Sequence, residues 1–254
     1  MPTSDKERLL NKLDAPLDDL HLPPESRLER TRAFKRLRGF IEKLLYERHM
    51  DTADLAIEVE HFERDFVHYQ PSRWLPMRWA IRKLRLGPDD VFVEFGCGKG
   101  RVVCEAARHP LARVIGVEVS PRLVEQARAN VERGRGRFKC QDIEIITADA
   151  TGWAIPDDMT VAYLNYPFVG DTFRRVIDNI DESIVRNPRK VRLVYMCPAL
   201  EDYILHTTHF RLVAKRRGRG ERAKSTSATV SLYQHDASTK TQRAGAHSRP
   251  QRPA

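Results

Sequence analysis

Acidic residues and glycines recur at the ends of apolar segments in the middle of this chain. Glu94 lies in the run Val91-Phe-Val-Glu-Phe95, and Gly96, Gly98 and Gly100 follow directly. Glycines at this spacing let the backbone turn sharply and approach a ligand closely, and a helix beginning behind them favours an anionic group. Glu118 ends the next apolar run, where a carboxylate can accept hydrogen bonds from both hydroxyls of a ribose. These residues predict a nucleoside-binding site.

Two further polar elements follow later apolar runs. Asp149 comes just after residues 143–147, where its carboxylate can accept a hydrogen bond from an adenine amino group. After residues 159–164 the chain reads Asn165, Tyr166, Pro167, Phe168. All of these elements fall at the carboxyl ends of predicted strands, which is where open α/β sheets bind their ligands. They therefore predict a single site at one edge of a sheet.

The elements that must position these residues alternate between strands and helices. Strands are expected at residues 91–95, 113–118, 143–147, 159–164 and 191–196, and a closing hairpin at 210–214 and 229–233. Ser120-Pro121 begins one of the intervening helices, because Ser suits a helix cap and Pro the first helical position. This alternation predicts an α/β fold with a doubly wound, mostly parallel seven-stranded sheet.

The two ends of the chain have a different composition. The first 85 residues read as helices, with an apolar stripe that includes Phe34, Leu37 and Ile41. From Asp236 onward almost nothing is apolar, which is typical of disorder. We therefore divide the chain into a helical N-terminal extension (1–85), a ligand-binding domain (86–235) and a disordered basic tail (236–254).

The charge of the chain favours anionic partners. The net charge is +9 and the pI is about 9.6, which suits nucleic acid, an acidic protein surface or a phosphorylated small molecule. Arg-rich composition alone offers the other explanation. The N-terminus lacks the apolar stretch of a signal peptide, and no apolar run is long enough to span a membrane. Neither the four cysteines nor the nine histidines show a zinc-type spacing. We expect a cytoplasmic protein without a metal or membrane partner.

The ordered motifs resemble those of a known family. The segments VFVEFGCGKGRVVCEAAR, VIGVEVSPRLVEQARANVE, ITADAT and YLNYPF resemble the class I, seven-strand methyltransferases that use S-adenosylmethionine. The lead-in Tyr69-Gln-Pro71-Ser72 is similar to that of a subgroup containing telomeric-silencing-type lysine methyltransferases and bacterial relatives. The resemblance implies that residues 86–235 are an S-adenosylmethionine-binding domain of an enzyme.

The resemblance also implies a role for each motif. Gly96, Gly98 and Gly100 would form the cofactor turn. Glu94 would hold the methionine amino group, Glu118 the ribose and Asp149 the adenine amine, with Tyr69 over the cofactor. Asn165, Tyr166, Pro167 and Phe168 would face the sulfonium and the incoming nucleophile. Tyr166 stands where amine-methylating relatives often carry Pro, so N-methylation and other methylation both stay open.

Two other functions fit parts of the sequence. A catalytically silent, methyltransferase-like protein that binds nucleic acid would explain the charge, and a nucleotide-cofactor oxidoreductase would explain the glycine turn. The predicted hairpin tip bears on the first, because its cations would lie beside the mouth of the site: Lys215, Arg216, Arg217, Arg219, Arg222 and Lys224, against the single carboxylate of Glu221. A solvated surface loop would have the same composition.

Overall fold

We describe the chain from a computed structural model, covering residues 50–52, 71–217 and 229–235. All of these residues lie in one compact unit, Glu42–Ala254. The predicted stripe at residues 34–45, Tyr69, most of the loop at the hairpin tip and the tail from Asp236 lie outside the described residues. None of the described helices is both long and apolar enough to cross a bilayer.

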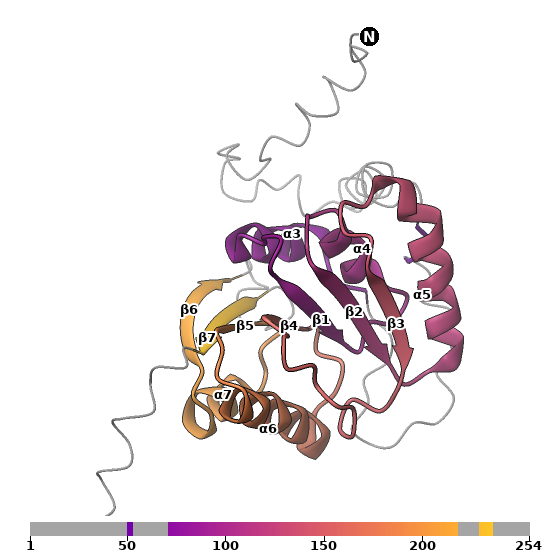
Figure 1. Ribbon diagram of the computed structural model, residues 1–254. Coiled ribbons are helices and arrows are strands. Elements are labelled where there is room, and N and C mark those ends of the chain that lie inside the picture. Colours follow the sequence, from indigo (N-terminus) through magenta and orange to yellow (C-terminus); the bar gives the residue numbers. More distant parts are fainter. Residues whose placement is uncertain (1–49, 53–70, 218–228, 236–254) are drawn as a thin grey trace, which may run out of the picture. The chain divides into compact units, whose positions relative to one another are not determined.

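A seven-stranded sheet forms the centre of this unit (Figure 1). Its strands are β1 (Val91–Phe95), β2 (Arg113–Glu118), β3 (Ile143–Thr147), β4 (Val161–Leu164), β5 (Val191–Met196), β6 (Arg211–Arg216) and β7 (Val230–His235). They are arranged in the order β3-β2-β1-β4-β5-β7-β6. The first five strands are parallel, and β7 is antiparallel to both β5 and β6. The predicted doubly wound, mostly parallel seven-stranded sheet is thus confirmed.

Helices cover both faces of the sheet (Figure 1). On one face lie α3 (Trp74–Leu84), α4 (Arg101–Ala107) and α5 (Pro121–Gly134), which is followed by a short 3-10 turn at Arg135–Arg137. On the other lie α6 (Gly170–Arg186) and α7 (Glu201–Thr207). Alternate strand residues supply the two apolar layers, with Phe92 and Val114 facing the first set of helices and Val93 and Ile115 the second.

Local sequence explains how these helices begin and pack. Ser120 caps α5 by accepting a hydrogen bond from the Leu123 amide at 3.4 Å, and Pro121 occupies the first helical position. The buried residues of α3 recur every three or four positions, which gives the helix one apolar face: Trp74, Met77, Ala80, Ile81 and Leu84. Helix α3 therefore packs on the sheet, although the sequence places it in the extension. The domain boundaries themselves stay predictions.

The structure differs from the sequence-based expectation at several element ends. Strand β4 begins at Val161 rather than at Met159. Thr160 instead links the strand starts, because its hydroxyl donates to Asp90 at 2.7 Å and accepts from the Val91 amide at 3.1 Å. Helix α7 was not expected at all, since its seven residues are too few to give a clear periodic pattern.

Candidate functional site

The glycine turn joins β1 to α4. Gly96, Gly98 and Gly100 have φ angles of 74°, 52° and 77°, a region that other residues rarely adopt. A Cβ atom on Gly100 would lie 3.2 Å from the Cβ of Ala127 in α5, and one on Gly96 would lie 2.3 Å from the Cβ of Pro167. The turn is therefore bordered closely by α5 on one side and by the segment after β4 on the other.

Glu118 is attached directly to this turn. Its Oε2 accepts a hydrogen bond from the Gly98 amide at 2.9 Å, and its Oε1 accepts one from the Ser120 amide at 3.0 Å. The side chain is buried, and this burial raises the pKa of the carboxyl, opposed by the N–H groups of Ser120 and Gly98. Each carboxylate oxygen has two lone pairs, so both retain the capacity to accept a further hydrogen bond from a ligand.

Glu94 lies inside β1 and is 3% exposed. Its Oε2 is buried without a hydrogen-bond partner among the residues that the structure describes. Burial, reinforced by the negative charge of Glu118 and opposed by the Val103 N–H, raises the pKa of Glu94 well above its ordinary value. A buried carboxyl without a counterion is either protonated or able to pair with a cation that a ligand supplies.

Asp149 lies at the surface just past β3. Its carboxylate accepts hydrogen bonds from the amide and the hydroxyl of Thr151, both at 2.8 Å. The Thr151 carbonyl in turn accepts from the Asn179 side chain of α6 at 2.8 Å. These bonds fix the turn after β3, so Asp149 has a defined place at the carboxyl edge of the sheet.

The segment from Asn165 to Phe168 follows β4 at the same edge. Tyr166 has a φ of 52°, and Cys197, just past the neighbouring β5, has a φ of 53°. Non-glycine residues held in this region concentrate at functional sites, where surrounding contacts maintain the strain. Pro167 packs against the glycine turn, whereas Phe168 is 2% exposed and packs in the apolar layer under α6. Phe168 is thus buried as an ordinary core side chain is, and its role facing a ligand stays a prediction.

The lead-in is represented by Pro71 and Ser72, because Tyr69 lies outside the described residues. Arg101, the first residue of α4, donates to the Ser72 carbonyl at 2.8 Å and to the Thr52 hydroxyl at 2.9 Å. Its guanidinium lies over the Trp74 ring, 4.9 Å from the centroid. The buried Arg101 therefore anchors two upstream segments to the helix that follows the glycine turn.

Sequence reasoning missed this anchor and a second one on α5. Asn130 donates to the Lys99 carbonyl within the turn at 2.9 Å and accepts from the Asp51 amide at 2.8 Å. The one signal that the sequence carries for this contact is an Asn in line with the apolar residues of the helix, and the structure shows that Asn130 is fully buried. Arg101 carries no such signal, because arginine is frequent throughout the chain.

The hairpin of β6 and β7 also differs from the expectation in where its loop begins. Lys215 and Arg216 belong to β6 rather than to the loop. Lys215 forms an ion pair with Glu201 of α7, whose carboxylate also accepts from the hydroxyls of Ser231 and Tyr233, both at 2.8 Å. Val230 pairs with both Met196 and Arg216, so the end of β6 and the start of β7 lie at the carboxyl end of β5. The charge of Lys215 is already paired there with Glu201.

Comparison with known proteins assigns the central part of the chain. Residues 92–184 match a family described as a methyltransferase domain. A ribosomal protein L11 methyltransferase from Burkholderia mallei is 32% identical over 88 residues, 35% of this chain and 24% of the relative. A protein-lysine N-methyltransferase from Saccharolobus islandicus is 29% identical over 68 residues, 26% of this chain and 42% of the relative. The chain thus spans less than half the length of these relatives.

Solved structures with a similar arrangement include an RNA methyltransferase from Salinibacter ruber in complex with S-adenosyl-L-homocysteine. It is 18% identical, with a TM-score of 0.45, over 65% of this chain and 92% of that one. A SAM-dependent O-methyltransferase from Thermotoga maritima is 14% identical, with a TM-score of 0.49, over 66% and 67% of the two chains. By sequence, the central part of the chain, residues 92–184, is thus a methyltransferase domain.

Proposed function

We propose that the protein transfers a methyl group from S-adenosylmethionine to an amine on a protein. The observation that carries the proposal is the buried carboxyl of Glu94, which lacks a partner for Oε2 beside the glycine turn. The amino group of this cofactor is a cation, and next to a cation the buried carboxyl would give up its proton and form an ion pair. Glu118 adds acceptor capacity for the ribose hydroxyls, and Asp149 adds it for the adenine amine. The chemistry of these side chains therefore fits the cofactor.

The sheet order argues against an oxidoreductase. Dinucleotide-binding enzymes of the doubly wound type have the order 3-2-1-4-5-6. Here the antiparallel β7 lies between β5 and β6. The turn also has the spacing GxGxG rather than GxGxxG. A nicotinamide cofactor is thus the poorer fit to this chain.

When bound, S-adenosylmethionine supplies a methyl group on a sulfonium, which a nucleophile takes by in-line displacement. The contribution of the chain is to position the reactants and to exclude water. A lysine amine has an ordinary pKa of roughly 10.4 and must lose its proton before it can attack. The Asn165 side chain, at the end of β4, would accept a hydrogen bond from the neutral amine and orient its lone pair. The Tyr166 ring would lie next to the cationic product.

The choice of a protein amine rests on two of the relatives, whose names give a ribosomal protein and protein lysine as their targets. The test is to incubate the full chain and radiolabelled S-adenosylmethionine with a cell lysate, and then to separate protein, nucleic acid and small molecules. Label should enter protein and survive as methylated lysine or N-terminal amine after acid hydrolysis. Label confined to nucleic acid or small molecules would refute the acceptor, and failure to bind the cofactor in calorimetry would refute the whole proposal.

A further inference from the structure

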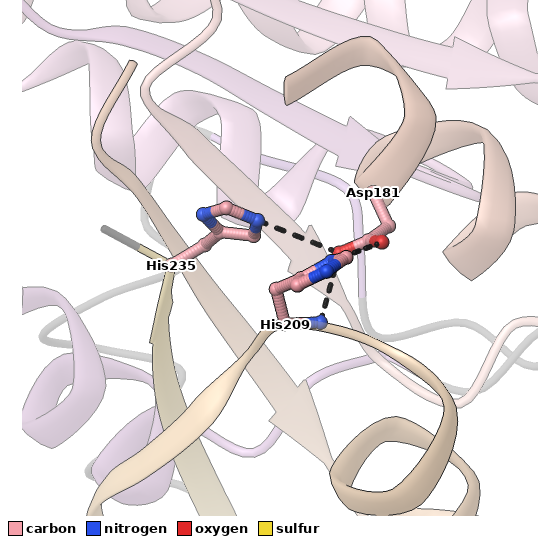
Figure 2. Close-up of side chains that lie close together, drawn as sticks. All are labelled: Asp181, His209 and His235. Carbon is pink, nitrogen blue, oxygen red and sulfur yellow. Dashed lines mark hydrogen bonds and ion pairs between the residues drawn. The ribbon is translucent and has the colours of Figure 1, made fainter. Parts of the chain in front are cut away.

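Three side chains with metal-binding atoms lie close together (Figure 2). Asp181 lies on α6, His209 lies between α7 and β6, and His235 is the last residue of β7. Val191, the first residue of β5, pairs with His235. The parallel strands begin at this edge and end at the other, so the cluster is separate from the candidate cofactor site.

The distances within the cluster suit a single ion. His209 Nδ1 lies 2.9 Å from Asp181 Oδ2, and His235 Nε2 lies 3.6 Å from Asp181 Oδ1. One ligand atom from each residue falls within 4.8 Å of the others. Zn²⁺ bonds of roughly 2.0–2.1 Å in tetrahedral geometry put neighbouring ligand atoms about 3.4 Å apart. Small side-chain rotations would therefore bring all three atoms onto one ion.

The surroundings hold the ligands in place. The backbone amide of His209 donates to Asp181 Oδ1 at 3.1 Å, which fixes the carboxylate as an outer hydrogen bond does in metal sites. His235 is 6% exposed, and its ring packs edge-on against Phe210, with centroids 5.5 Å apart. The side chain of His209 is 45% exposed, so an ion and a water ligand have access from solvent.

We propose that Asp181, His209 and His235 bind one Zn²⁺ ion, with water as the fourth ligand. Two imidazoles and one carboxylate form a nitrogen and oxygen set that suits Zn²⁺, whereas Mg²⁺ and Ca²⁺ prefer oxygen alone. The ligands come from three separate elements. The ion would therefore fasten the β6–β7 hairpin to α6, at the end of the sheet remote from the glycine turn.

The test uses the full chain after treatment with a chelator, and Zn²⁺ itself as the probe in competition with a chromophoric indicator. The wild-type protein should bind one more equivalent than His209→Ala and Asp181→Asn. Loss of a ligand should weaken that site by roughly 100-fold or more, beyond the effect of losing an outer partner. His206→Ala, at an exposed histidine of α7, is the matched control and should bind as the wild type does.

Two further measurements distinguish Zn²⁺ binding at this cluster from Zn²⁺ binding by other cysteines and histidines of the chain. Zn²⁺ should shift the ring-nitrogen NMR signals of His209 and His235, and it should raise the Tm of the wild type and His206→Ala but not of the two ligand variants. Circular dichroism of the metal-free variants checks that they fold. Equal stoichiometry and affinity in all four proteins, or unmoved signals from His209 and His235, would overturn the proposal and leave a hydrogen-bonded Asp–His cluster.

Discussion

Gly96 and Pro167 touch so closely that no side chain fits between them: a Cβ atom on Gly96 would lie 2.3 Å from the Cβ of Pro167. Through this contact the turn after β1 is shaped by the segment after β4. The two segments are adjacent because β1 and β4 are neighbours in the sheet. The geometry of the candidate cofactor turn thus depends on a residue from the candidate acceptor side.

Gly96→Ala should therefore destabilise the fold and impair cofactor binding together. The added methyl group meets Pro167, and the φ of 74° is strained for alanine. We expect a loss of about 2 kcal/mol or more in the free energy of unfolding, measured by urea denaturation. Gly152→Ala is the control, because nothing lies within 4 Å of its added Cβ. Equal losses in the two variants would contradict the contact.

Glu118→Ala should weaken the binding of S-adenosylmethionine by about 1–3 kcal/mol, the scale of losing hydrogen bonds to a charged group. It also frees the amides of Gly98 and Ser120, so the Tm should be recorded alongside calorimetry. Glu125→Ala removes an exposed carboxylate from α5 and should leave the affinity unchanged. If Glu118→Ala binds S-adenosylmethionine with wild-type affinity, Glu118 does not bind the ribose.

Cofactor binding should release protons from Glu94. Burial raises the pKa of this carboxyl in the free protein, and a bound ammonium group would lower it again. Between the two values, binding expels a proton, so affinity should increase as the pH rises through that window. Calorimetry in two buffers with different ionisation enthalpies measures the release. Glu94→Gln should abolish this proton release. An identical release from the variant would show that the proton comes from another group.

Acid should abolish the stabilisation provided by Glu201. The pKa of this carboxyl is held below its usual range because, although burial opposes ionisation, Lys215, Tyr233 and Ser231 all donate hydrogen bonds to it. A lowered folded-state pKa gives stability that is present above roughly pH 4.3 and is lost as the pH falls further. Glu201→Gln should thus cost about 1–3 kcal/mol near pH 7 and progressively less below pH 4.

The control for this effect is Asp202→Asn, a change at the exposed neighbouring residue. Urea denaturation of the wild type and both variants across the pH series provides the comparison. A constant difference between the wild type and Glu201→Gln at all pH values would mean that ionisation of Glu201 contributes nothing.

Neutralising the hairpin cations should weaken the binding of the acceptor rather than the binding of the cofactor. Arg216, Arg217 and Arg219, all changed to Gln, should raise the KM for an anionic acceptor and flatten its dependence on salt, since fewer counterions are displaced. The same change at Arg133, Arg135 and Arg137 removes equal charge near the end of α5. If both triple variants behave alike, only net charge matters and the hairpin has no specific role.

How much of the structure can be predicted from the sequence depends on how far apart in the chain the contacting residues lie. The strands, the glycine turn and the capped start of α5 follow from residues adjacent in the chain. The structure contains all of them, although β4 and the two hairpin strands have other ends than expected. The cofactor and acceptor roles of all the predicted site residues, Glu94 and Glu118 included, stay predictions. The anchor between Arg101 and Thr52 joins residues 49 positions apart, and the Asp181–His209–His235 cluster draws on three elements. No local pattern encodes such contacts, because they exist only once the sheet order brings the elements together.

The place of β7 in the sheet has a consequence for the order in which the chain folds. The outer edge of β5 pairs with β7 rather than with β6, although β6 precedes β7 in the chain. During synthesis, β6 can thus emerge without its partner while β5 still exposes an open, apolar edge. Such an edge invites pairing with other chains. Assembly from the ribosome is therefore most vulnerable to aggregation in the interval before Val230–His235 arrives and closes the sheet.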